Sequence, residues 1–212
     1  MYDQKTTIED FLDATAAKQP TPGGGSVTAL AGALAAAMGE MVLNYSVGKK
    51  DLAQHQDELK SGLSELARAR TLLLGLMSED QAAYEALTAA RKLPASDPTR
   101  QKQLDVALVA CIRVPEAMGA TALAILSEAD RLVDKVNYHL LSDLAVCCEL
   151  AMATLRSAGY NVRVNLPELQ DPQDRIRVQG EVDHLLTRAT HVVSRAVGRI
   201  WARHAREGQK TP

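Results

Sequence analysis

Three features of this sequence are suited to acid–base chemistry on an anionic small molecule. The first is the stretch 20–26, Pro-Thr-Pro-Gly-Gly-Gly-Ser, where glycine lets the backbone approach a ligand closely. The other two are Asp80 and Asp143, which fall at apolar positions of helical patterns. Burying an unpaired charge is costly, so such a carboxylate is paired, lies at a helix break or is functional.

The glycine stretch leads into a long run of small residues. Ser26 is a good N-cap, and the sequence predicts one helix over residues 27–47. The start of such a helix has unpaired N–H groups and the positive end of the helix dipole, which suit an anion. The same glycines are also typical of a tight turn packed against a neighbouring helix. The spacing is not that of a phosphate-binding P-loop.

Asp80 continues a heptad pattern. The pattern predicts a long helix with one apolar seam, whose members are Leu52, Leu59, Leu66 and Leu73. Asp80 then stands where the seam calls for another buried apolar residue. A second interpretation is open, because Ser78-x-x-Gln81 is a capping pattern that would place Asp80 in the exposed first turn of a new helix. The pattern alone does not decide between the two.

Asp143 lies in a segment, residues 138–158, that is apolar on nearly every side and is therefore expected to be a central helix. His139 is one turn before it, a spacing more often found in a structural pair. Gly159 is expected to end this helix. Asn161 and Asn165 then fall in the loop that follows, where asparagines are mostly turn formers.

Composition excludes several classes of function. The net charge of −2 argues against a nucleic-acid-binding surface. Five scattered histidines and three cysteines without ligand spacing argue against a metal site, and the cysteines suggest a reduced, cytoplasmic setting. The helix over 27–47 is long enough to cross a membrane. Alanine and glycine give it little apolar area and Glu40 lies within it, so we expect a bundle helix and no membrane partner.

The expected fold is all-α, an orthogonal or up-down bundle of about six to eight helices with long central helices, formed by residues 1–212 as a single domain. The last helix is expected over about 172–206, with its arginines forming a solvated face. The leucine seam is longer than one globular core requires, which predicts a homodimer.

Several motifs, in order, resemble those of the cyclodeaminase/cyclohydrolase family of folate enzymes. The resemblance covers roughly residues 7–200 and rests on Pro20–Val27 with its small-residue helix, Asn44, Gly48-Lys49-Lys50, Asp80-Gln-Ala-Ala-Tyr84, Lys92-Leu93-Pro94, Val114-Pro115, Asn137, Ser142-Asp143 and Asn161-Val-Arg-Val-Asn165. This family includes the C-terminal domain of formiminotransferase-cyclodeaminase and stand-alone methenyltetrahydrofolate cyclohydrolases. It implies either cyclodeamination of 5-formimidoyltetrahydrofolate or hydrolysis of 5,10-methenyltetrahydrofolate, and does not choose between them.

The resemblance also implies the site. It makes Asp80 and Asp143 catalytic, one as charge stabiliser and the other as proton shuttle, and assigns Lys49, Lys50 and the loop N–H groups to the folate glutamate tail. The substrate-binding residues expected on this basis are Pro22, Gly23, Gly24, Gly25, Ser26, Asn44, Lys49, Lys50, Asn137, Ser142, Asn161 and Asn165.

The expected partners are a folate, polyglutamylated or not, a second copy of the chain, and a separate formiminotransferase where the reaction is cyclodeamination. The folate site is expected close to the dimer interface. No metal or permanently bound cofactor is expected, and the tetrahydrofolate derivative is the substrate. A non-catalytic helical dimerisation or scaffold module is the alternative, although charged residues at apolar positions favour the enzyme.

Overall fold

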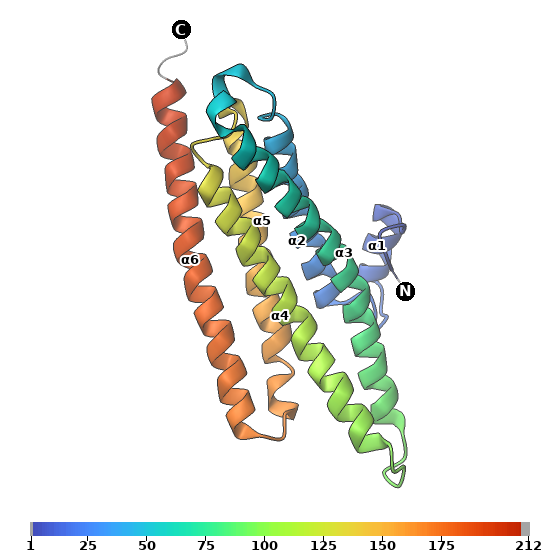
Figure 1. Cartoon of the computed structure of the whole chain (residues 1–212). Helices are drawn as coiled ribbons and strands as arrows, with labels where there is room; N and C mark the ends of the chain where they lie inside the picture. The colour runs from blue at the N-terminus through green and yellow to red at the C-terminus, as the bar shows by residue number, and fades with distance from the viewer. Residues whose placement is uncertain (1, 209–212) are drawn as a thin grey trace.

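The computed structural model describes residues 2–208 as an antiparallel bundle of long helices, with no strand in that range (Figure 1). This confirms the expected all-α class. The α-helices are α1 (Ile8–Ala16), α2 (Gly24–Asn44), α3 (Gln56–Lys92), α4 (Arg100–Leu132), α5 (Leu141–Arg163) and α6 (Pro172–Gly208), with short 3₁₀ turns η1 (Lys50–His55), η2 (Tyr138–Leu140) and η3 (Leu166–Glu168). Figure 1 shows α6 on one side of the bundle and α1 on the other.

Helix α2 packs closely between α3 and α5 because its inner face consists of small residues. At Gly32, a methyl carbon would lie 2.9 Å from Thr154 Cγ2 and 3.0 Å from Leu73 Cδ1. The Thr154 hydroxyl donates to the carbonyl of Leu150 at 2.8 Å, which holds this β-branched side chain in place. Glycine at this position therefore sets how near α2 can come to α3 and α5.

Helix α3 runs without a break through Asp80, so the interpretation of Ser78-x-x-Gln81 as a new N-cap is wrong. Gln81 is fully buried instead, and its side chain bonds to the backbone N–H and carbonyl of Tyr2 at 2.8 and 2.7 Å. These two bonds anchor the N-terminal segment to α3.

The leucine seam also differs from expectation. Leu59, Leu66 and Leu73 are buried inside this single chain, and Leu52 belongs to the 3₁₀ turn before α3. The seam therefore serves the bundle's own core, and the reason given for a homodimer is wrong because the leucines are already buried where α3 packs against α2 and α4.

Helix α5 is central, as predicted, and touches α2, α4 and α6. It does not end at Gly159 but continues to Arg163. Gly159 is used for packing, because a methyl carbon there would meet Val182 Cγ1 of α6 at 3.3 Å. Asn161 consequently lies in the last turn of α5 rather than in a loop.

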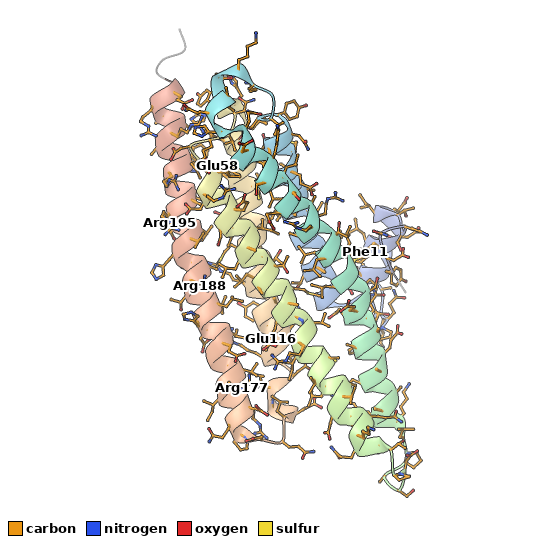
Figure 2. All side chains as sticks on the ribbon, in the orientation of Figure 1. Phe11, Glu58, Glu116, Arg177, Arg188 and Arg195 are labelled. Atoms are coloured by element: carbon orange, nitrogen blue, oxygen red, sulfur yellow. The ribbon has the colours of Figure 1, made fainter. Side chains whose placement is uncertain are left out.

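Several arginines of α6 are anchored to α4 rather than forming a wholly solvated face, a correction to the sequence-based expectation. Arg195 and Arg199 both bind the buried carboxylate of Asp130, at 2.7 and 3.0 Å, and Arg203 is buried and donates to the carbonyl of Val133 at 2.6 Å. Figure 2 shows Arg177, Arg188 and Arg195 spaced along α6. The pairing with α4 exists because Asp130 occupies an otherwise apolar layer and requires cationic partners.

By length and composition, α2, α4 and the segment Tyr138–Glu168 are apolar enough to cross a membrane. About half of the apolar stretch of each of these segments is buried inside the bundle, and for α2 the buried share is 56%. The expectation that α2 is a bundle helix is confirmed by this burial, whereas the absence of a membrane partner stays a prediction.

Replacing Gly32 by Ala should destabilise the protein relative to replacing Gly75 by Ala. Gly75 lies in α3 with no atom within 4 Å of the added carbon, so its substitution should stabilise by about 0.5–1 kcal/mol through helix propensity. Both variants gain this propensity, so the difference between their unfolding free energies isolates the packing cost, about 1–3 kcal/mol. Urea titration measures it, and equal stabilisation in both would contradict the close packing of α2.

Candidate active site

Asp80 lies on the wall of a cavity of about 360 Å³ at the end of the bundle where α2 begins. Its lining comes from the glycine stretch, α3, α4, the end of α5 and the turn that follows. The lining residues are Pro20, Thr21, Gly23, Gly24, Gly25, Asp80, Tyr84, Leu87, Arg91, Cys111, Pro115, Asn161, Val164, Asn165 and Glu168. Of the residues predicted to bind substrate, this cavity gathers the three glycines and both asparagines near the end of α5.

The carboxylate of Asp80 occupies the N-terminus of α2. The helix begins at Gly24, three residues earlier than expected, with Gly23 as its N-cap and Ser26 in its first turn. The Ser26 hydroxyl donates to Asp80 Oδ2 at 3.3 Å. The first-turn N–H groups and the positive end of the helix dipole thus face a carboxylate of the protein itself. The anion site that the sequence predicted for the substrate is therefore used for Asp80.

Gly25 makes this approach possible. A methyl carbon on Gly25 would overlap the whole Asp80 carboxyl group, both oxygens and Cγ. Any other residue at this position would have to push α3 away from α2 or turn the carboxylate out of the cavity. The site therefore requires glycine at this position. From the sequence alone, the glycines were expected only to let the backbone approach a ligand closely.

Burial raises the pKa of the Asp80 carboxyl above its usual value of 3.8, and hydrogen bonds from the Ser26 side chain and backbone act in the opposite direction. The net effect is a carboxyl group that holds its proton more readily than an exposed aspartate. A carboxyl group with a raised pKa is better suited than an exposed aspartate to accept and return a proton, as an acid–base catalyst must.

The two asparagines hold the far wall of the cavity. Asn165 Nδ2 donates to the carbonyls of Asn161 and Cys111 at 2.9 and 3.2 Å, and Asn161 Nδ2 donates to Thr28 Oγ1 at 3.2 Å. Thr28 Oγ1 donates in turn to the carbonyl of Gly24 at 2.7 Å. This chain of bonds ties the end of α5 to the start of α2, and leaves Asn161 Oδ1 close to Gly24.

Other predicted site residues lie at the opposite end of the bundle. Asn137 donates through its backbone N–H to Ser46 Oγ at 2.8 Å, beside the C-terminus of α2. Asp143 is half-buried in the first turn of α5, and Asn161 is in the last turn of the same helix. The two residues are 18 positions apart, which corresponds to about 27 Å along the axis. The second group consists of Asn44, Lys49, Lys50, Asn137, Ser142 and Asp143.

One chain therefore does not bring Asp80 and Asp143 to the same substrate. Pro22 and Ser26 are buried beside the cavity rather than in its lining, and the Thr21–Pro22 peptide is cis.

Sequence reasoning missed Tyr84, Leu87 and Arg91 as lining residues. They follow Asp80 at intervals of four, three and four residues, the spacing of one helix face, which could have indicated them.

A further cavity of about 400 Å³ lies between α4, α5 and α6. Its lining is mostly aliphatic, and the Arg113 and Glu116 side chains on its wall bind each other at 2.9 Å. None of the predicted site residues lines it.

Among the residues 2–208 that the structure describes, no group of three or more His, Cys, Asp or Glu side chains is placed to hold a metal ion.

The sequence is similar to a family of known proteins. The sequence model of the family described as formiminotransferase-cyclodeaminase matches residues 7–184. The chain is 34% identical over 190 residues to a methenyltetrahydrofolate cyclohydrolase of Methylorubrum extorquens, covering 86% of this chain and 90% of that protein. It is 30% identical to a formimidoyltransferase-cyclodeaminase of Gallus gallus, where the match covers 84% of this chain and only 34% of the longer protein.

A solved structure shares the fold. The crystal structure of formiminotetrahydrofolate cyclodeaminase from Thermotoga maritima matches with a TM-score of 0.86 and 27% sequence identity, over 93% of this chain and 97% of that one. The family match, the nearly full-length match to the cyclohydrolase and the shared fold agree with one another. The chain belongs to the formiminotransferase-cyclodeaminase family.

Proposed function

We propose that the chain is a tetrahydrofolate one-carbon enzyme that hydrolyses 5,10-methenyltetrahydrofolate to 10-formyltetrahydrofolate. The observation that carries this proposal is the Asp80 carboxyl group, held at the N-terminus of α2 with a raised pKa on the wall of the cavity. Similarity to a methenyltetrahydrofolate cyclohydrolase over nearly the full length of both chains supports this reaction first.

The substrate carries a positive charge delocalised over N5, the bridging carbon and N10. Asp80 in its ionised form stabilises this charge and takes a proton from water as its oxygen attacks the bridging carbon. The carbon–N5 bond of the resulting adduct then breaks, and N5 receives the proton that Asp80 holds. The second proton of the water leaves to solvent, which gives 10-formyltetrahydrofolate and one proton from substrate and water.

Cyclodeamination is the second candidate, favoured by the shared fold with a cyclodeaminase. Here N10 attacks the formimidoyl carbon of 5-formimidoyltetrahydrofolate in its protonated, amidinium form, a proton passes from N10 to the departing amine, and ammonia leaves with the positive charge remaining on the methenyl bridge. The same carboxyl group can take and return that proton. A separate formiminotransferase would supply the substrate. We further propose a cytoplasmic setting, and turnover without a metal or bound cofactor.

The two reactions are separated by methenyl absorbance. A cyclohydrolase removes the absorbance of added methenyltetrahydrofolate, whereas a cyclodeaminase forms it from formimidoyltetrahydrofolate and releases ammonia. We expect turnover of the first substrate, equal with and without exhaustive chelation. A folded protein that turns over neither substrate would contradict the proposal and favour the scaffold alternative.

Replacing Asp80 by Asn should lower turnover by about 100-fold or more, since Asn keeps the shape but cannot accept the proton. Replacing Glu79 by Gln, an exposed neighbour on the same helix, is the matched control and should leave turnover unchanged. In the wild type, turnover should fall as the pH drops through the raised pKa of Asp80, so the acid limb should lie above 3.8. Full activity of the Asn variant would refute the assignment.

The same variant tests the pKa direction through stability. Because the folded-state pKa of Asp80 is raised, the folded protein binds more protons than the unfolded chain between 3.8 and the raised value. The contribution of Asp80 to wild-type stability is therefore lost progressively as pH rises through this window. The melting temperature of Asp80→Asn relative to wild type should rise from pH 4 to pH 7, which the Glu79→Gln control should not show.

We also propose a homodimer formed through the outer face of α2. Along this face lies an apolar stripe that recurs at helical spacing, with Val27, Leu34 and Tyr45 between 40% and 62% exposed. The stripe also includes the half-buried Leu30, Met38 and Met41. The charged residue of α2, Glu40, points to α3, where Arg70 Nε donates to it at 2.6 Å. The stripe is therefore uncharged along its length, as an interface core requires.

A two-fold axis through the middle of this stripe would pair α2 with its copy in antiparallel fashion. The Asp80 cavity of one protomer would then lie next to the Asn44, Lys49 and Asp143 end of the other. Such a dimer accounts for the division of the predicted site residues between two ends about 30 Å apart along α2. Asp80 and Asp143 would then serve one site from different protomers.

Mixing the two inactive variants Asp80→Asn and Asp143→Asn under subunit exchange tests this arrangement. Half of the randomly formed dimers are heterodimers, and each would contain one intact site of its two, so about a quarter of wild-type activity should return. Leu34→Glu should give an inactive monomer with normal helicity, whereas Leu72→Glu, an exposed leucine of α3, should remain dimeric. No recovery on mixing, or an active Leu34→Glu monomer, would contradict the shared site.

A further inference from the structure

One face of α3 contributes a row of side chains to the lining of the cavity. Asp80, Tyr84, Leu87 and Arg91 all line it, at intervals of four, three and four residues. Their backbones span roughly 16 Å at 1.5 Å per residue. A carboxyl group therefore stands at one end, an aromatic and an aliphatic side chain in the middle, and a guanidinium at the other end.

Among the described residues that line this cavity, Arg91 is the only one with a positive charge. Lys49 and Lys50, which the sequence suggested for the glutamate tail, lie beyond the C-terminus of α2, at the other end of the bundle. From its own protomer, the cavity therefore has one cation with which to receive a carboxylate, and arginine is well suited to that geometry.

Arg91 is already bound by a carboxylate of the protein. Its Nη2 donates to Glu168 Oε1 and Oε2 at 2.6 and 2.7 Å. Both side chains are nearly half exposed, at 45% and 46%, so the pair contributes little stability and exchanges readily. Both contacts use Nη2, so the donors at Nε and Nη1 are not used in the pair. Glu168 belongs to the turn η3, between α5 and α6.

We propose that Arg91 is the residue that recognises the glutamate carboxylate of the folate substrate, and that Glu168 is its exchangeable counter-ion in the empty site. This proposal rests on the proposed function. The order along α3 matches the order of groups in the substrate: the charged one-carbon centre at Asp80, the aminobenzoyl ring beside Tyr84 and Leu87, and the carboxylate at Arg91. Arg91 is a specificity-determining residue that orients the substrate and takes no part in the chemical step.

The test compares two substrates that differ only at the tail. These are 5,10-methenyltetrahydrofolate and 5,10-methenyltetrahydropteroate, which has the same reacting ring and benzoyl group but no glutamate. Arg91→Gln should raise KM for the folate by about tenfold or more through loss of a charge-assisted hydrogen bond. Its KM for the pteroate should not change, and kcat should change little for either substrate.

Glu168→Gln should act in the opposite direction, because it removes the competing carboxylate. We expect KM for the folate to fall by about two- to fivefold, as for loss of an exposed ion pair, with KM for the pteroate unchanged. The control pair is Arg163–Asp183, an ion pair of 2.7 Å between α5 and α6 outside this lining. Arg163→Gln and Asp183→Asn should change neither KM.

A merely structural role of the pair would give a different pattern. In that case both variants would raise KM for both substrates and lower the melting temperature, and this result would overturn the proposal. So would an unchanged KM for the folate in Arg91→Gln.

Binding of 4-aminobenzoylglutamate, measured by calorimetry, tests the tail contact without turnover. Wild type should bind it, and Arg91→Gln should bind about tenfold more weakly or worse. Arg91-dependent binding without turnover of either folate would contradict the proposed function alone. Turnover with no Arg91 dependence of KM or of binding would contradict this inference alone.

Discussion

The site depends on the close approach of the Asp80 carboxylate to the first turn of α2. This approach needs glycine at position 25, because any side chain there would occupy the space of the carboxyl group. It also requires α3 to continue as a helix past the end of α2. Helix α3 is continuous over its 37 residues. The N-terminus of α2 partly offsets the cost of burying the charge, and burial keeps the pKa above that of an ordinary aspartate.

The other walls of the cavity follow from this contact. Asn161 reaches the start of α2, and Asn165 reaches α4, because α5 continues past Gly159 against α6. Their hydrogen bonds to Thr28 and to the Cys111 carbonyl hold α2, α4 and α5 at fixed separation around the cavity. A site on the ends of packed helices is more rigid than one on loops, which suits a reaction that depends on where one proton is held.

Long helices also place far apart some of the residues that the sequence motifs assign to one site. Residues at the two ends of α2 or α5 lie about 30 Å apart, however similar their chemistry, because each residue adds 1.5 Å. Asp143, Asn44 and Lys49 therefore cannot serve the Asp80 cavity of their own chain. The uncharged outer stripe of α2 offers the geometry by which a second copy would supply them, a different basis for a dimer from the leucine seam.

Sequence alone determined the helical class, the long helices, the central position of α5, and Asp80 with the glycine stretch as a candidate site. These follow from periodicity, composition and motif order, which act locally along the chain. Only the tertiary structure decided which anion faces α2, that the leucine seam belongs to the chain's own core, and that Arg91 lies on the Asp80 face near Glu168. Such facts depend on contacts between distant segments, such as that between Arg91 and Glu168, 77 residues apart, and a local pattern does not reveal which distant partner a side chain meets.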